Sequence, residues 1–287
     1  MKKVAIVADS NCGITKNEAE KLGVFLVPMP FIIDGEIFFE GVNLSVDEFF
    51  EKQLVTKITT SQPNINDVVE IWKEILKNYD EIVHIPMSSG LSKSCETANT
   101  FAQEFEGKVQ VVDNHRISVT QKASVLDAVR MARDGKSAVE IKNWLEETGK
   151  DSSIYIMVNT LKYLKQGGRV TPAVAMFGEI LHIKPVLQIQ GGKLDQFAKV
   201  LNVKSAKAKM IDGLKRDLNG RFAEYVAMGK MKISVAHTKN DENAKIFAQE
   251  IEKIFPNLEF EYIDPLSLSV ATHIGPGSLA CACYRVY

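Results

Sequence analysis

Apolar runs of strand length alternate with amphipathic stretches along the first half of the chain. Val4–Ala8, Ile82–Met87 and Lys108–Val112 are such runs, and polar residues follow each of them. Between the first two, Ile65–Tyr79 repeats apolar residues at intervals of three and four, which predicts a helix with one apolar face. Strands that alternate with helices indicate a mostly parallel sheet, because a parallel connection needs a long crossover.

Local signals define the ends of several other elements in this part of the chain. Ser45 with Glu48, and Ser137 with Glu140, have the spacing of a capping box, which predicts that a helix begins at each serine. Asp34-Gly35 lies between two apolar flanks and predicts a hairpin turn. The remaining elements expected here are a strand at Val24–Pro30, the hairpin at Phe31–Phe39, and helices at Thr15–Leu22, Ser45–Leu54, Leu91–Phe105, Val119–Arg133 and Ala138–Glu147.

The pattern changes after the polar stretch 148–151, where we place a domain boundary. A Gly191-Gly192 turn predicts a second hairpin, and strands are mixed with helices thereafter. The elements expected here are strands at Ser153–Val158, Pro185–Ile189, Lys193–Val200, Lys232–His237, Leu258–Ile263 and Ser278–Val286, and helices from Thr160 and at Pro172–Leu181, Lys204–Leu218 and Asp241–Phe255. We therefore expect an α/β protein with two domains. Residues 1–151 would form a mostly parallel sheet with flanking helices, and residues 152–287 a mixed α/β domain.

Composition narrows the class of protein. The 287 residues are 45% apolar and 25% charged, with a net charge of −1, so the basic surface of a nucleic-acid-binding protein is not expected. No apolar run has the length of a membrane span or a signal peptide, which predicts a cytoplasmic protein without membrane insertion. The four cysteines include no Cys-x-x-Cys pair, so we expect reduced thiols and no metal site.

Three polar segments are the candidates for chemistry. Thr59–Pro63, Ser88–Ser92 and Thr272–Gly277 are each expected to be loops beside apolar segments, and together they supply hydroxyls, backbone donors and the imidazole of His273. Ser88–Ser92 follows a predicted strand and precedes a helix, where free N–H groups and the helix dipole favour an anion. The alternative is that these serines only cap the helix. Gly275 allows the backbone close to a ligand.

Ser92 and His273 could also form a nucleophile and its base. That pairing would give a hydrolase or a phosphoryl-transfer enzyme acting on a small anionic substrate. The chain has neither a GxSxG elbow nor a phosphate-binding GxxxxGK[ST] loop. No third residue of a triad is marked, although Asp9 and Asp113 both end predicted strands. We favour anion binding over this alternative.

Six short motifs make the interpretation specific. Asp9-Ser10, Thr60–Pro63, Ser88–Ser92, Leu164–Val170, Ile183–Val186 and His273–Gly277 occur in this order. The series resembles the DegV family of bacterial fatty-acid-binding proteins, and it spans essentially the whole chain. The resemblance implies a two-domain α/β protein that buries one long-chain fatty acid, of about 14–18 carbons, in a tunnel.

The resemblance also implies the residues that hold the ligand. Thr60, Ser92 and His273 would bind the carboxylate, with Ser61 beside them. Residues expected to support this site are Ser89, Gly90, Arg169 and Gly275. Such a protein is a carrier without catalytic residues or a cofactor, and it would present the fatty acid to a separate fatty acid kinase.

Two positions depart from the family pattern. The family usually continues the serine motif as Gly-Thr, where this chain has Lys93-Ser94. We expect Lys93 to project into solvent. Lys204 stands where relatives often carry Arg, and lysine cannot reproduce the bidentate contacts of arginine.

Overall fold

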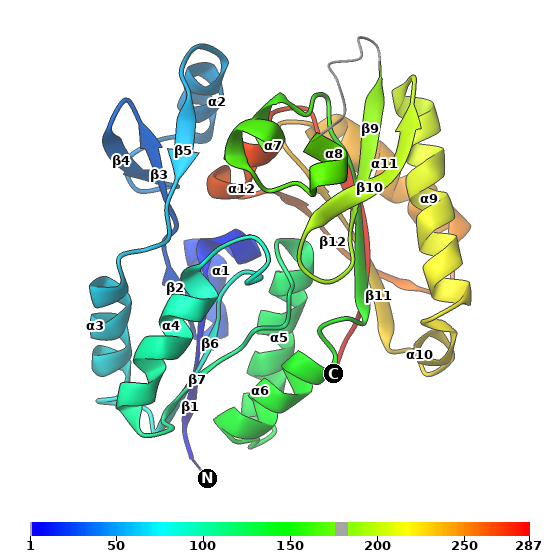
Figure 1. Cartoon of the computed structure of the whole chain (residues 1–287). Coiled ribbons are helices and arrows are strands. Elements are labelled where there is room, and N and C mark those ends of the chain that lie inside the picture. The colour runs from blue at the N-terminus through cyan, green and yellow to red at the C-terminus, as the bar shows by residue number, and fades with distance from the viewer. Residues whose placement is uncertain (1, 176–182) are drawn as a thin grey trace.

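The computed structural model describes residues 2–175 and 183–287 of the chain (Figure 1). The strands are β1 (Val4–Asp9), β2 (Val24–Val27), β3 (Pro30–Ile33), β4 (Glu36–Phe39), β5 (Ile58–Thr60), β6 (Glu81–Ile85), β7 (Val109–Val111), β8 (Ser152–Met157), β9 (Lys184–Ile189), β10 (Leu194–Val200), β11 (Met231–His237), β12 (Glu259–Pro265) and β13 (Leu279–Arg285). The α-helices are α1 (Lys16–Leu22), α2 (Val46–Val55), α3 (Ile65–Ile75), α4 (Ser94–Ala102), α5 (Val119–Arg133), α6 (Ala138–Glu147), α7 (Lys162–Gly167), α8 (Pro172–Ala175), α9 (Val203–Asn219), α10 (Ala223–Ala227), α11 (Asp241–Ile254) and α12 (Leu268–Ile274). Short 3₁₀ helices lie at Ser10–Cys12 and Gln103–Phe105.

The N-terminal half, residues 2–151, is built on a parallel sheet with the strand order β2-β1-β6-β7. Successive side chains of a strand point to opposite faces. Ala5 and Val7 of β1 therefore pack with α3 and α4, and Ile6 and Ala8 pack with α1, α5 and α6. Because both faces are covered, the strands are mostly apolar. The capping boxes at Ser45 and Ser137 are both present.

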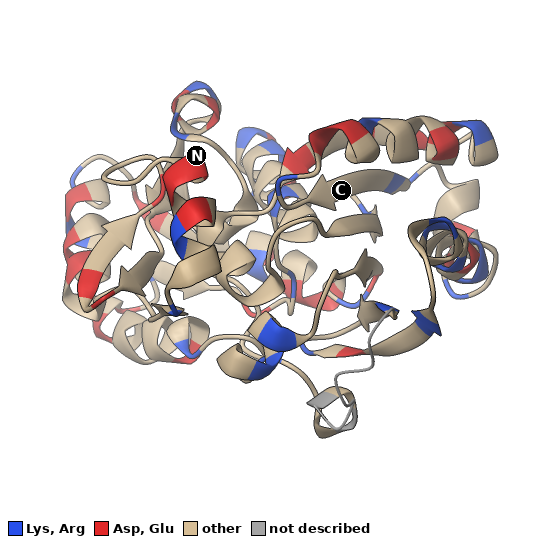
Figure 2. Cartoon of the chain, turned by 90° about the horizontal axis from the view of Figure 1, so that it is seen from above, with Lys and Arg blue, Asp and Glu red and all other residues tan. Residues whose placement is uncertain are grey.

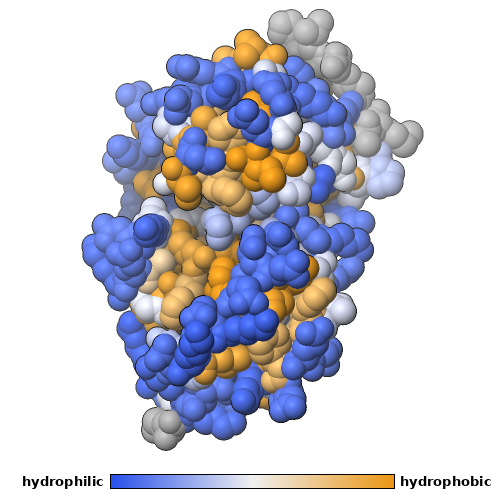
Figure 3. Space-filling view, turned by 90° about the vertical axis from the view of Figure 1, so that its left-hand side faces the viewer, coloured by the Kyte–Doolittle hydropathy of each residue, from blue (hydrophilic) through white to orange (hydrophobic). Residues whose placement is uncertain are grey.

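A separate three-stranded antiparallel sheet, with the order β4-β3-β5, stands beside the parallel one (Figure 1). The sequence predicted its hairpin but not β5. Phe31 of β3 and Phe49 of α2 pack with Leu268 of α12, so this sheet and α2 contact the C-terminal half. Figure 3 shows apolar side chains at the surface on the side of the molecule where β4 and α2 lie. Ile37 of β4 and Leu54 of α2 are exposed apolar residues of these elements.

The C-terminal half, residues 152–287, contains a six-stranded mixed sheet with the order β10-β9-β8-β13-β11-β12. Tyr155 and Met157 of β8 pack beneath α9 and α11. Ile154 and Ile156 face the opposite way, in a core shared with Met87 of the N-terminal half. One face of this sheet is thus covered by its own helices and the other by the rest of the chain.

Polar contacts also join the two halves. Lys122 of α5 lies with its ammonium group 2.8 Å from the carboxylate of Asp264 on β12 and 3.2 Å from that of Glu18. The Tyr262 hydroxyl donates to the Val119 carbonyl at 2.6 Å. Seen from above, charged residues of both signs cover the outer helices, whereas the strands between them carry few (Figure 2).

Several expected boundaries were wrong. Thr272 and His273 do not lie in a loop, because Ser267 caps a helix, α12, that continues to Ile274. Thr60 ends strand β5, and α4 begins at Ser94 rather than Leu91. Of the expected helix Pro172–Leu181, α8 covers the first four residues, and 176–182 lie outside the described residues. None of the described helices combines the length and the apolar character needed to cross a bilayer.

Candidate ligand-binding site

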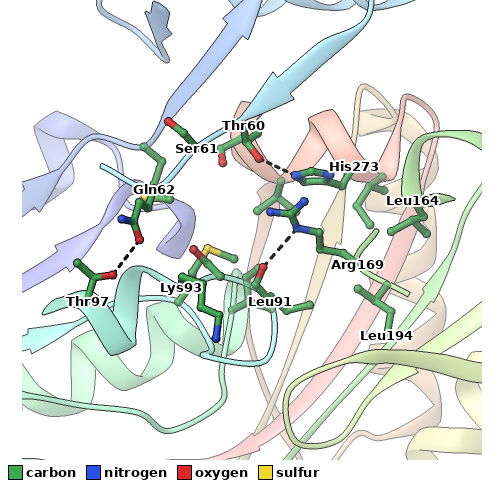
Figure 4. A pocket seen from close by; sticks show the side chains of 17 residues that line it. Thr60, Ser61, Gln62, Leu91, Lys93, Thr97, Leu164, Arg169, Leu194 and His273 are labelled. Atoms are coloured by element: carbon green, nitrogen blue, oxygen red, sulfur yellow. Dashed lines mark hydrogen bonds between the residues drawn. The ribbon is translucent and has the colours of Figure 1, made fainter. Parts of the chain in front are cut away.

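A cavity of about 520 Å³ lies where the two halves meet (Figure 4). Its walls come from the segment after β5, the turn between β6 and α4, and helices α7 and α12. Both halves therefore contribute to it. This volume is within the range of pockets that hold small organic ligands.

One end of the cavity is polar. Among the candidate residues from the sequence, Thr60, Ser61, Ser92, Arg169 and His273 all line it. They come from four segments that are far apart in the chain, and the fold brings them to one place.

Thr60 and His273 are in direct contact across the halves. Thr60 Oγ1 and His273 Nε2 are 2.8 Å apart, and this hydrogen bond is drawn in Figure 4. On the other side of the ring, α7 approaches closely. A Cβ atom on Gly167 would lie 2.0 Å from His273 Nδ1, so only glycine leaves room for the imidazole here.

The electrostatics of the site keep His273 neutral. Burial, and next the positive charge of Arg169, lower the pKa of His273 to about 4. A neutral imidazole has one donor and one acceptor nitrogen. Neutral His273 can therefore form its hydrogen bond with Thr60 without placing a second positive charge beside Arg169.

Arg169 places a positive charge beside His273 at this end. Its Nε donates to the Leu91 carbonyl at 3.4 Å, and Nη1 donates to the Gly167 carbonyl. Within the described part of the chain it forms no ion pair, and the residues described as lining the cavity include no Asp or Glu. A half-buried guanidinium whose partners are carbonyls is suited to receive an anion.

Ser92 lies on the turn between β6 and α4. Its Oγ accepts a hydrogen bond from the Ser94 N–H at 3.2 Å, so its own hydroxyl hydrogen can be donated into the cavity. On the facing segment, Gln62 Oε1 accepts from Thr97 Oγ1 at 3.0 Å (Figure 4). This bond ties the segment after β5 to helix α4 at the wall of the cavity.

The rest of the lining is largely apolar and comes from both halves. The apolar lining residues are Met29, Met87, Leu91, Ile117, Leu164, Leu194, Val270 and Ile274. Polar groups that gather at one end of an apolar cavity favour an amphipathic ligand with a single anionic group.

Three expected supporting residues lie outside this lining. The Ser89 N–H donates to Asp113 at 3.3 Å, and its hydroxyl faces His115. A Cβ on Gly90 would lie 2.7 Å from the Gly192 carbonyl oxygen, so this glycine serves packing between the halves. Gly275 has a φ of +79° and lies against the Tyr163 ring. Their roles in this structure are in the backbone and its packing.

The geometry gives little support to a Ser–His nucleophile. No hydrogen bond joins Ser92 to His273 in the described ranges, and the partner of His273 Nε2 is Thr60. Asp9 accepts from the Met87 N–H at 2.7 Å, and Asp113 lies beside Ser89. No cluster of His, Cys, Asp or Glu suited to a metal ion occurs in the part of the chain that the structure describes.

Sequence reasoning missed several residues of the lining. Gln62 belongs to the polar segment Thr59–Pro63, but the sequence does not indicate its hydrogen bond with Thr97. Met29 and Leu194 lie in the predicted strands Val24–Pro30 and Lys193–Val200, and no local pattern distinguishes them from core residues. Ser269 also lines the cavity and lies on α12. The spacing of Leu268, Ala271 and Ile274 is typical of a helix and could have predicted this element.

Comparison with known proteins gives a consistent result. The family model described as an uncharacterised protein of the DegV family matches residues 3–286. A DegV domain-containing protein of Deinococcus radiodurans is 30% identical over 282 residues, which are 97% of each chain. The protein DegV of Bacillus subtilis is 29% identical, and the alignment covers 98% of this chain and 99% of that protein.

Two solved structures share the fold over the whole length. The structure of DegV from Bacillus subtilis, described as a fatty-acid-binding protein, superimposes with a TM-score of 0.85 at 27% identity, covering 99% of this chain and 100% of that one. A DegV family protein from Thermus thermophilus, reported with fatty-acid binding, gives a TM-score of 0.88 at 26% identity and covers 100% of both chains.

Proposed function

The chain belongs to the DegV family, and on this basis we propose that it binds one long-chain fatty acid at the junction of its two halves. The observation that carries the proposal is the one-sided chemistry of the cavity. Hydroxyls, an imidazole and Arg169 line one end, the described lining includes no Asp or Glu, and most of the remaining lining side chains are apolar. The fatty-acid binding reported for the relatives from Bacillus subtilis and Thermus thermophilus supports it.

We propose that Thr60, Ser92 and His273 hold the carboxylate, with Ser61 beside them and Arg169 as the compensating charge. With the proton on Nε2, His273 donates to Thr60 Oγ1. The Thr60 hydroxyl then donates to the ligand, and Ser92 does the same from the other half. A carboxylate taken from water needs several such donors, or it becomes protonated instead.

The acyl chain would supply most of the affinity. Each buried methylene contributes roughly 0.8 kcal/mol, so about ten methylenes supply roughly 8 kcal/mol before ordering costs are subtracted. The apolar lining comes from both halves, so the acyl chain would be enclosed between them, as in a tunnel. We propose ligands of about 14–18 carbons on this basis.

We further propose a carrier role in the cytoplasm, without catalysis by the chain itself. The polar end of the cavity includes Ser61, Gln62 and Lys93, which are exposed, so a second protein could reach the carboxylate there. A separate fatty acid kinase is the partner that this arrangement suits. All four cysteines are unpaired thiols, which fits a reducing compartment.

The experiment that tests ligand class is direct. The purified protein is extracted with organic solvent, and the extract is analysed by mass spectrometry. We expect fatty acids of about 14–18 carbons, close to one per chain. A protein that comes out empty and then takes up none of these acids would contradict the proposal.

A second experiment separates the carrier from an enzyme. Esters and phosphoesters are offered to the parent protein and to Ser92→Ala, and neither is expected to turn them over. The loaded parent protein is then incubated with magnesium and ATP, with and without a bacterial fatty acid kinase. Acyl phosphate is expected only when the kinase is present, and turnover by the protein alone would favour the enzyme.

A further inference from the structure

Behind the wall of the ligand cavity lies a second, much smaller void of about 10 Å³. Its lining includes three buried polar residues, which are Asp9 of β1, His84 of β6 and Ser94 of α4. Gln62 and Thr97 line both spaces and separate them. The volume corresponds to about one water-sized sphere, which is the smallest space that can hold a water molecule.

His84 and Ser94 have unpaired polar atoms in this buried place. Neither ring nitrogen of His84, nor the hydroxyl of Ser94, has a hydrogen-bond partner among the described residues. Burial lowers the pKa of His84 to about 3, so the ring is neutral and presents one donor and one acceptor. Buried polar groups are nearly always paired with protein or with ordered water, so these atoms require a partner.

Asp9 supplies a third group with remaining capacity. Its carboxylate accepts from the Met87 N–H at 2.7 Å, from the Asn11 N–H at 3.1 Å and from Gln121 Nε2 at 3.0 Å. An ionised carboxylate offers about four lone-pair sites, so one more donor can be accommodated. Three polar groups around one void are the usual coordination of a buried water.

We infer that one water molecule is bound in this void by Asp9, His84 and Ser94, and that it braces the turn that carries Ser92. The connection is short, because the Ser94 N–H donates to Ser92 Oγ at 3.2 Å. A fixed Ser94 holds the Ser92 oxygen, and with it the direction in which the Ser92 hydroxyl donates. The effect on ligand affinity rests on the proposed fatty-acid function, whereas the water site itself does not.

A crystal structure of the full chain at a resolution that shows ordered water tests the site itself. We expect a solvent peak within hydrogen-bond distance, about 2.6–3.2 Å, of all three side chains. A void without density, or one filled by a rotated side chain, would overturn the inference whether or not a fatty acid is bound.

Variants test the coupling that the water provides. Ser94→Ala removes the hydroxyl but keeps the N–H that holds Ser92. His84→Phe keeps the ring contact with Trp72, whose centroid lies 5.4 Å away. We expect each change to weaken fatty-acid binding by about two- to tenfold. The double variant should lose no more than the larger single loss, because both changes remove the same water.

A matched control and a second measurement keep the test independent of ligand. Ser234→Ala removes another buried hydroxyl, which contacts Tyr284 and lies away from both cavities, and it should leave fatty-acid affinity unchanged. The same cycle of His84 and Ser94 variants is measured by chemical unfolding without ligand. If the two single variants lose unfolding free energy additively in the double variant, the inference is overturned. A non-additive cycle in a protein that binds no fatty acid would reject the proposed function alone.

Discussion

At the scale of single residues, Thr60 is one of the places where the two halves of the chain touch at the pocket. Its hydroxyl bonds His273 and, in the proposed complex, also the carboxylate. We expect Thr60→Val to weaken fatty-acid binding roughly 10- to 100-fold, since a hydrogen bond to a charged group is lost. Thr59→Val is the matched control, because Thr59 is exposed on the same strand and should change affinity little. Titration with a fluorescent fatty acid measures both, and equal losses would contradict the assignment.

The two cations beside the pocket allow a second comparison. Arg169 is half-buried with carbonyl partners, whereas Lys93 is 77% exposed and pairs with Glu96 at 2.8 Å. Arg169→Gln is expected to weaken binding about tenfold, through loss of the compensating charge. Lys93→Gln is expected to change it less than about twofold, because an exposed charge is screened. Calorimetric titration of both variants decides, and the reverse order would show that Lys93 faces the ligand.

The site could be predicted in part from sequence at this scale. Thr60, Ser92 and His273 were predicted because each belongs to a short polar motif. All three line one cavity, and their binding of a carboxylate stays a prediction. Ser89, Gly90 and Gly275 belong to the same motifs but lie outside the lining. A motif indicates that a turn has a function, but the direction of each side chain in that turn depends on packing with distant segments, such as the one that contains Gly192.

At the scale of elements, the close approach of α7 to α12 holds the imidazole in place. Gly167 is the last residue of α7, where alanine would ordinarily stabilise a helix by up to about 1 kcal/mol. Here its Cβ would meet the His273 ring. We therefore expect Gly167→Ala to weaken fatty-acid binding at least tenfold, about as much as losing one hydrogen bond to a charged group. Gln166→Ala, on the exposed side of the same helix, should leave binding unchanged in the same titration.

A Gly167→Ala variant that binds as tightly as the parent would mean that the ring moves without consequence. His273 would then not be a carboxylate ligand. Circular dichroism of both variants shows whether the helices are intact, so a loss of binding can be assigned to the site.

The elements themselves were predictable where local chemistry decides them. Capping boxes at Ser45 and Ser137 and the apolar face of α3 are local signals, and the structure contains all three. Strand β5 was missed because its three residues acquire strand character only by pairing with β3. Helix α12 was not predicted, because the Gly275-Pro276-Gly277 sequence that follows it is typical of a loop.

At the scale of the whole molecule, buried ionisable groups link stability to pH. Burial lowers the pKa of His84 to about 3, so between about pH 6 and pH 4 the unfolded chain binds a proton there that the folded chain does not. Folding is therefore weakened as the pH falls, by about 1.4 kcal/mol per pH unit from this residue. Asp9 acts in the opposite direction, since burial raises its pKa to about 6 and its folded form gains stability by taking up a proton.

The contribution of His84 can be isolated with His84→Phe. The difference in unfolding free energy between variant and parent should shift in favour of the variant, by about 1.4 kcal/mol per pH unit, from pH 6 to pH 4. Urea titrations at several pH values measure it. Parallel profiles for the two proteins would mean that His84 is protonated in the folded state.

The arrangement of the two halves predicts which backbone amides a bound ligand protects from hydrogen exchange. In the proposed complex, the donors to the carboxylate come from both halves, with Ser92 before α4 and His273 on α12. A ligand held by both should slow hydrogen exchange at the backbone amides of 92–95 and 272–275 together. At a hundred times its dissociation constant it adds about 2.7 kcal/mol of stability, or several degrees in Tm.

Hydrogen exchange with and without a saturating C16 acid measures this directly. The amides of 246–251 on α11 serve as an internal control, since that helix packs on the far face of the six-stranded sheet and contributes nothing to the cavity lining. Protection confined to one half would show that the carboxylate is held there alone. The hydrogen bond between Thr60 and His273 would then be a structural contact between the halves rather than part of the binding site.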